Sequence, residues 1–319
     1  MLAVNLEIEF RVSIFAQFLP SPPQSEPDAW IGWLLATFFE MKAFVLFSLL
    51  FGVGLAIQYE RLAASDRRAV LLVRRMLVLL LFGLIHLLLI WNGDILTEYA
   101  LASLIVLPFL YSGTRGLLAG ATLFLALYLC LPLWAQLIPF PSTAALVHQV
   151  AAATTAYGTG GFAQVLDFSW RELPLMLPLH GYLFPRTIGL MLLGALSWRL
   201  GLFKQVGELR GWLWFAAAAL IAAGAALALA GLAGGLSPVV MALGYAALVL
   251  ALADGGPRWS TWVEPLGRMA FTNYVVQSIA MGFIFFGYGL GLSTARRSWQ
   301  AVGGSAASAS APSSGCGAR

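Results

Sequence analysis

The hydrophobic pattern of this chain consists of long apolar runs separated by short polar loops. Most of the runs are about 17–22 residues long, which is the length a helix needs to cross a hydrocarbon core of roughly 30 Å. A soluble domain would instead alternate polar and apolar faces along each element. We therefore predict an all-α fold, a polytopic transmembrane helix bundle of about eight full spans. These spans lie at about residues 41–58, 72–91, 95–111, 116–137, 183–200, 212–231, 239–253 and 269–287.

Three segments depart from this pattern. Residues 1–19 form an apolar run that three charged residues interrupt, which predicts a truncated N-terminal membrane helix or an interfacial helix. Residues 138–185 are too polar to cross, and we expect short interfacial helices there. The end of the chain is small, polar and without pattern, which indicates a disordered tail or a frameshifted gene end. We predict one transmembrane domain over residues 1–292 and a disordered or frameshifted tail over residues 293–319.

Composition supports the membrane class, and charge predicts the orientation. Apolar residues make up 60% of the chain and charged residues 10%, whereas an ordinary soluble domain has roughly 25% charged residues. The net charge of +4 does not indicate nucleic-acid binding, because the basic residues sit in short loops that set topology. Eleven of them lie in one set of alternate loops and Arg171 alone in the opposite set, which predicts a non-cytoplasmic Trp91–Asp94 loop. The two cysteines and three widely spaced histidines predict no disulfide framework and no metal site.

Polar residues gather around the junction of the second and third spans. Four of them lie inside or at the edge of the hydrocarbon, where polar groups are costly and usually functional: His86, Asn92, Asp94 and Glu98. We take His86, Asp94 and Glu98 as catalytic candidates, a base with two orienting acids. Trp91 and Asn92 are substrate-binding candidates beside them. The alternative is that Asn92 and Asp94 cap the third span, while His86 makes a structural bond between helices.

A single arginine enters the fifth span on the same predicted side. Arg186 follows Pro185 and is suited to holding an anionic substrate group or pairing with Asp94 or Glu98. The alternative is that it reaches for lipid headgroups at the interface. His180, six residues earlier, is a weaker candidate in the same layer.

Two spans carry residues suited to contacts between helices. Gly52 and Gly54 in the first span permit close helix approach. Asn273 and Gln277 share one face of the last span, where they bond to another helix or line a cavity. With Arg268, at the cytoplasmic start of that span, we include them among the substrate-binding candidates.

Three segments together resemble the YeiB family: residues 44–55 (FVLFSLLFGVGL), 85–96 (IHLLLIWNGDIL) and 267–277 (GRMAFTNYVVQ). The resemblance covers about residues 4–292 and implies a multi-pass protein of the bacterial inner membrane, built on a domain of unknown function. The family is distantly similar to membrane acyltransferases that acetylate sugars from cytoplasmic acyl-coenzyme A and use a buried histidine. That histidine falls near the position of Asn5, which we add as a substrate-binding candidate.

Two functions are consistent with these residues. The first is an acyl-group transferase that modifies an extracytoplasmic small molecule or glycan, with acyl-coenzyme A as the donor and no other cofactor indicated. The alternative is a transporter or permease for a small anionic solute, in which the same polar groups line a pathway. A scaffold in the lipid bilayer without turnover is the third reading. The sequence leaves open the oligomeric state and the choice between enzyme and transporter.

Overall fold

The computed structural model describes residues 13–19, 26–133, 138–231, 235–253 and 260–293. Within these ranges every regular element is helical, as the sequence predicts. The elements are η1 (Ile14–Phe18), α2 (Glu26–Phe38), α3 (Lys42–Arg61), α4 (Arg68–Leu89), α5 (Leu96–Leu110), α6 (Thr114–Cys130), α7 (Thr143–Thr159), α8 (Phe162–Arg199), α9 (Val206–Leu229), α10 (Leu236–Ala253), α11 (Ser260–Arg268) and α12 (Ala270–Phe285).

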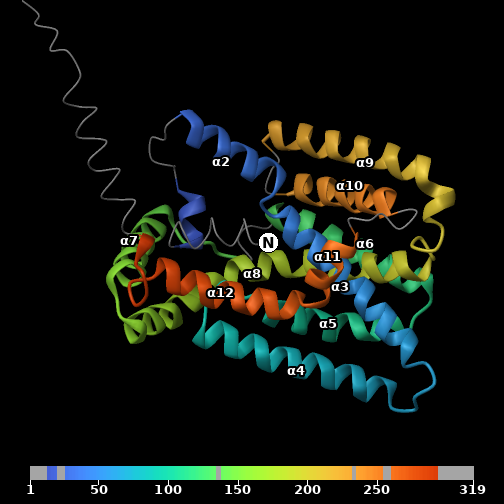
Figure 1. Cartoon of the computed structure of the whole chain (residues 1–319), viewed down its shortest axis with the longest axis horizontal. Helices are drawn as coiled ribbons and strands as arrows, with labels where there is room; N and C mark the ends of the chain where they lie inside the picture. The colour runs from blue at the N-terminus through green and yellow to red at the C-terminus, as the bar shows by residue number, and fades with distance from the viewer. Residues whose placement is uncertain (1–12, 20–25, 134–137, 232–234, 254–259, 294–319) are drawn as a thin grey trace, which may run out of the picture.

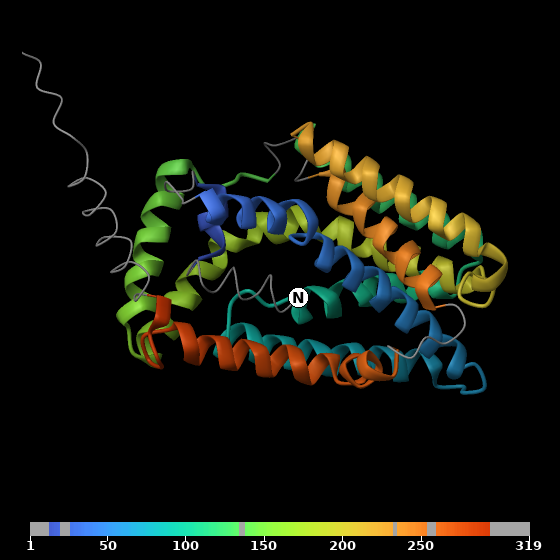
Figure 2. The same ribbon diagram turned by 45° about the horizontal axis from the view of Figure 1, so that its top comes forward.

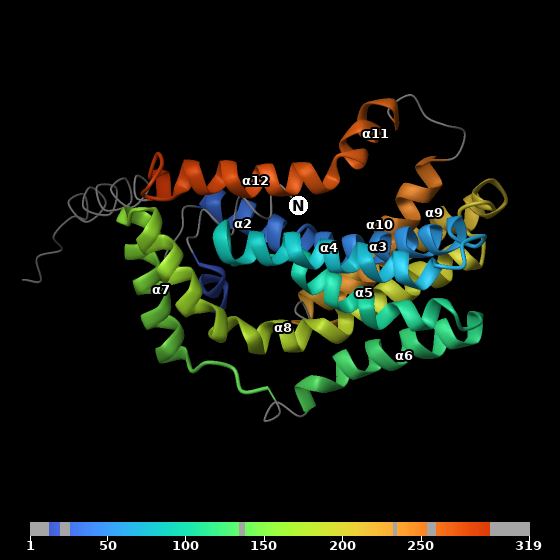
Figure 3. The same ribbon diagram turned by 90° about the horizontal axis from the view of Figure 1, so that it is seen from below.

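Most of the helices run along one long axis, and α8 is the element that the others share (Figure 1). It packs against α3, α5 and α6, while α9 and α10 form a separate pair that contacts α3 and α2. The largest apolar cluster includes Ile188, Met191, Leu192 and Ala195 of α8, all buried. Helix α7 crosses the end of the bundle (Figure 3).

Five helical segments are long and apolar enough to cross a membrane: Trp30–Arg61, Arg68–Leu89, Thr114–Leu133, Val206–Leu229 and Leu236–Ala253. This is the pattern of a multi-pass membrane protein, but eight full spans are not confirmed. Helices α5 and α12 are apolar but have only 15 and 16 residues. At 1.5 Å per residue they are shorter than a hydrocarbon core of roughly 30 Å.

The fifth predicted span is not a separate helix. Residues 183–199 belong to the second half of α8, which continues without a break from Phe162, and Leu200 is its C-cap. Together with α7, the first half of α8 replaces the short helices that we expected in residues 138–185. The sequence was misleading here because α8 contains Pro174, Pro178 and Pro185, residues that usually end helices. Instead α8 bends along its length, which is how a helix accommodates a missing N–H donor (Figure 3).

Helices α3 and α8 approach each other at backbone distance. A Cβ added at Gly52 would lie 1.9 Å from the Met191 carbonyl oxygen, and one at Gly194 would lie 2.0 Å from the Leu49 carbonyl oxygen. Neither position therefore accommodates a side chain without a shift of the helices. Of the two glycines expected at a helix contact, Gly52 is confirmed, whereas a Cβ at Gly54 would meet no atom within 4 Å.

Basic residues join several helix ends at one end of the bundle. The Arg199 guanidinium donates to the carbonyl oxygens of Leu110, at 2.7 Å, and of Ser112. The Arg68 guanidinium lies 4.3 Å from the Tyr59 ring centroid. The ends of α3, α5 and α8 and the start of α4 therefore meet there, while the α4–α5 loop and α7 lie toward the other end (Figure 2). The predicted orientation requires this separation.

We expect Gly52→Ala to destabilise the protein by about 1–3 kcal/mol, because the added methyl group forces α3 away from α8. Gly54→Ala is the matched control in the same helix, and we expect it to be neutral or to stabilise by about 0.5–1 kcal/mol through helix propensity. Thermal unfolding of the detergent-purified variants measures both. Equal melting temperatures for the two variants would contradict the close α3–α8 contact.

Candidate functional site

The loop between α4 and α5 is held by a buried carboxylate. Asp94 accepts hydrogen bonds from the backbone N–H groups of Leu96, at 3.1 Å, and Thr97, at 2.7 Å. It therefore caps α5, as one of the two readings of the sequence predicts for Asp94, whereas Asn92, for which the same role was expected, donates to Glu172. His86 Nδ1 lies 3.0 Å from Asp94 Oδ1. Neither ring nitrogen of His86 has a hydrogen-bond partner among the described residues, so this close contact with the carboxylate is not counted as a hydrogen bond.

The His86 side chain is enclosed and has little access to a ligand. Its exposed fraction is 1%. The Tyr274 ring of α12 lies against it, with the ring centroids 4.9 Å apart, and the Tyr274 hydroxyl accepts from the Ile95 N–H at 3.2 Å. His86 thus links α4, the α4–α5 loop and α12.

A cavity of about 600 Å³ lies beside this loop. Its walls come from η1, the start of α3, the α4–α5 loop, α5, the end of α6 and the middle of α8. The volume is in the range of pockets that bind small molecules. Its lining is largely apolar, and its polar side chains are Gln17, Glu40, Ser48, Asp94, Glu98, Tyr99, His180, Tyr182, Arg186 and Thr187.

A carboxylate–histidine pair on facing turns of α5 and α8 opens on this cavity. Glu98 Oε2 lies 3.0 Å from His180 Nδ1, and the Thr187 hydroxyl donates to Glu98 Oε1 at 2.5 Å. His180 and Thr187 are seven residues apart on α8, two helical turns, so both face α5. Because Nδ1 is engaged by Glu98, Nε2 is the ring nitrogen left for a ligand. A carboxylate that orients an imidazole in this way is the arrangement of a general base.

Arg186 is a buried cation in the cavity wall. Its exposed fraction is 2%, and in the described part of the chain neither Nε nor Nη1 has a hydrogen-bond partner. The guanidinium carbon lies 5.7 Å from the Tyr128 ring centroid. Among the described residues no ion pair joins Arg186 to Asp94 or Glu98, which were its expected partners. A buried guanidinium without an acceptor is costly, so the site is suited to an anionic group.

A second polar cluster joins the α4–α5 loop to α7 and α8. The Glu172 carboxylate accepts hydrogen bonds from the Asn92 amide at 2.7 Å, the Gln149 amide at 3.2 Å, the Tyr157 hydroxyl at 3.4 Å and the Ser13 hydroxyl at 3.5 Å. Burial raises the pKa of Glu172 above its ordinary value, and the hydrogen bonds from Asn92 and the other donors oppose this shift without cancelling it. Glu172 lies outside the candidate spans.

The remaining candidates fall into different places. Trp91 lines the cavity, whereas Asn92 is engaged with Glu172. Arg268 is exposed and pairs with Glu264 at 2.6 Å one turn away, which leaves it outside the cavity. Asn273 and Gln277 on α12 do not line it either, and Asn5 lies outside the described residues.

Sequence reasoning underrated one residue and missed the role of another. His180 was the weaker candidate, although its spacing of seven from Thr187 shows that the two share a helix face. Glu172 sits in a polar segment and carries no local signal, because its partners come from η1, α7 and the α4–α5 loop. Among the described residues no group of His, Cys, Asp and Glu side chains has the arrangement of a metal site, and the sequence predicts none.

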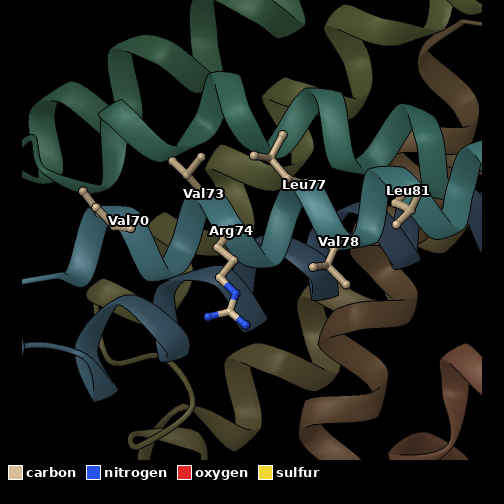
Figure 4. A pocket seen from close by; sticks show the side chains of 7 residues that line it. Val70, Val73, Arg74, Leu77, Val78 and Leu81 are labelled. Carbon is tan, nitrogen blue, oxygen red and sulfur yellow. The ribbon is translucent and has the colours of Figure 1, made fainter.

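The outer face of α4 carries a shallow groove of a different kind (Figure 4). Arg74 is its one charged side chain, and its apolar side chains are all exposed, as on a helix surface that contacts lipid. The groove is lined by Ala69, Val70, Val73, Arg74, Leu77, Val78 and Leu81.

Comparison with known proteins gives relatives whose activity is uncharacterised. The model of a family described as "Protein of unknown function (DUF418)" matches residues 223–309. The uncharacterised protein YxaH of Bacillus subtilis is 32% identical, over 84% of this chain and 72% of its own length. The uncharacterised protein YeiB of Escherichia coli is 27% identical, over 82% of this chain and 74% of its own length. No solved structure matches the chain significantly.

The raised pKa of Glu172 predicts a pH-dependent stability. The folded state binds the proton more tightly than the unfolded state, so the stabilisation is complete below the ordinary pKa of 4.5 and is lost as pH rises through the folded pKa. Each unit of the shift corresponds to about 1.4 kcal/mol. We expect the melting temperature to fall from pH 4.5 upwards, and Glu172→Gln to flatten this slope. Asp167→Asn, at an exposed site on the same helix, is the control that keeps it. A slope that Glu172→Gln leaves unchanged would refute the assignment.

Proposed function

This chain belongs to the YeiB family of uncharacterised proteins, which carries the DUF418 domain, and we propose that it transfers an acyl group to an acceptor at the non-cytoplasmic face of the membrane. The observation that carries the proposal is the Glu98–His180 pair, which opens on a cavity that also contains a buried, unpaired Arg186. A base and a cation that line one cavity can activate an acceptor and stabilise the oxyanion in acyl transfer. The proposal takes up the reaction class that the resemblance to membrane acyltransferases led us to expect from the sequence.

In the proposed reaction His180 is the general base. Its Nε2 takes the proton of an acceptor hydroxyl or amine while the acceptor atom attacks the acyl carbonyl carbon of a thioester such as acyl-coenzyme A. Glu98 stabilises the imidazolium that forms, as an ion pair across the 3.0 Å contact. Arg186 stabilises the negative charge on the carbonyl oxygen. The carbon–sulfur bond then breaks, and the leaving thiolate takes the proton from His180.

The proposal changes the assignment of roles made from the sequence. Glu98 stays the orienting acid, but it orients His180 and not His86. His86 and Asp94 act on structure, because Asp94 caps α5 and His86 is closed off under Tyr274. The exposed Arg75 lies in the first half of α4, toward the basic end of the bundle, which suits the anionic part of a cytoplasmic donor.

We expect His180→Gln to reduce acyl transfer by at least about 100-fold, the lower range for loss of a general base. The assay is transfer of label from acetyl-coenzyme A into periplasmic or membrane glycans, in cells that lack the native gene and express each variant. His148→Gln is the control, because His148 is exposed on α7 and does not line the cavity. His86→Ala separates the two histidines, and we expect it to lower the yield of folded protein with little effect on activity per folded molecule.

Three outcomes would count against the proposal. Labelling equal to that of cells without the protein removes the activity. Labelling that survives His180→Gln removes His180 from the mechanism. Uptake of an anionic solute into vesicles, without a covalent product, favours the transporter hypothesis, because the cavity would then be a step of a pathway.

A further inference from the structure

We propose that the cavity binds a single-chain acidic amphiphile, whose carboxylate or phosphate group is held by Arg186 and whose chain lies against the apolar wall. This inference names the substrate class of the proposed transferase and rests on that function for the ligand's role. Binding of the amphiphile does not depend on the transferase function, because binding needs no acyl donor. Three features of the site support the proposal: the donors of Arg186 that lack acceptors, the apolar character of the opposite wall, and the volume of the cavity.

The first feature is the set of Arg186 donors that lack acceptors. A guanidinium offers five N–H donors and no acceptor, and it stays charged in proteins. Both oxygens of Glu98 are already engaged, by His180 and Thr187, and Asp94 is engaged by the N-terminus of α5 and by His86. The three carboxylates of the cavity lining therefore have other partners, Glu40 included, while Nε and Nη1 of Arg186 are buried without an acceptor among the described residues. An anionic group in the cavity would balance the charge of this guanidinium.

The second feature is the apolar wall. The cavity volume equals about 20 water molecules at liquid density, and each buried water needs about three polar partners. The described wall opposite the α5–α8 face is mostly apolar, because η1 and the segment after α6 contribute Ile14, Phe18, Ile138 and Phe140, with Gln17 of η1 as a polar exception. Ser48 and Tyr99 are engaged with each other at 3.0 Å. A space with a charged side and an apolar side is filled better by an amphiphile than by water or an inorganic anion alone.

The third feature is the volume of the cavity. About 600 Å³ is the space for one drug-sized ligand and corresponds to one chain with its polar group. The α4 groove offers the contrasting case, because its side chains are exposed and Arg74 lies at the surface (Figure 4). Ordinary bilayer lipid can cover that groove, whereas the cavity at Arg186 contains a buried charge to neutralise.

The test is direct binding to the full chain in nanodiscs of zwitterionic lipid, with no acyl donor present. Three probes of equal chain length are compared: a fatty acid, a lysophosphatidate and a fatty alcohol. We expect both acids to bind about 10- to 100-fold more tightly than the alcohol, the range for charge-assisted hydrogen bonds. Preference for the fatty acid indicates a soluble source of ligand, and preference for lysophosphatidate a membrane source. Equal binding of acids and alcohol would overturn the inference.

Variants locate the binding. Arg186→Gln should remove the preference for the acids and leave alcohol binding unchanged, which also shows that the variant is folded. Arg171→Gln is the control, because Arg171 is exposed and paired with Asp167 on the same helix. If Arg186→Gln does not fold, Leu183→Trp keeps the cation and narrows the cavity, and it should weaken binding of all three probes. Acid binding that survives both substitutions would refute the site.

Failure of this inference is distinct from failure of the proposed function. If charged and neutral acceptors are acylated at equal rates, the acidic amphiphile is refuted as the substrate class, but the proposed transferase function stands. If the protein binds the acids selectively but has no transfer activity, the binding site is supported and the transferase function is refuted.

Discussion

The close approach of α3 and α8 is the constraint on which the cavity depends. Gly52 and Gly194 let each backbone contact the other. Ser48, one turn from Gly52, and Arg186, about two turns from Gly194, line the cavity. Helix α5 is held to this pair by the Tyr99 hydroxyl, which donates to the Phe44 carbonyl at 3.0 Å. With three helices held in this way, Glu98 of α5 and His180 of α8 lie 3.0 Å apart. A slightly wider spacing between the helices would break this contact. In a bilayer there is no hydrophobic driving force between helices, so they associate through close packing, which small residues such as glycine permit.

Two polar networks diverge from one short loop. Asp94 serves the start of α5 and contacts His86, while Asn92, two residues earlier, serves Glu172 and through it α7 and η1. Each network satisfies its own carboxylate, which is what burial of such groups requires. Arg186 is the exception in the cavity wall, since the described chain leaves two of its nitrogens unpaired. The contrast between satisfied carboxylates and an unsatisfied cation is the strongest chemical feature of the molecule.

The sequence predicted the helical membrane class because long apolar runs have one physical explanation. It also found the polar loop, Arg186 and Glu98, since charged residues beside such runs stand out. It did not predict that α8 continues through three prolines, because local propensity opposes this and only packing against α3, α5 and α6 stabilises it. The partner of Glu98 was equally hidden: His86 is nearer in sequence, but His180 is the histidine that α8 carries to it. Long-range pairing of that kind has no signature in a single sequence.

The continuity of α8 has a mechanical consequence. One helix carries Glu172, His180 and Arg186 and, at its last residue, Arg199, which binds the turn between α5 and α6. A single bent helix, with no loop between, therefore joins the polar clusters around Glu172 and Glu98 to the contacts of Arg199 at the opposite end of the bundle.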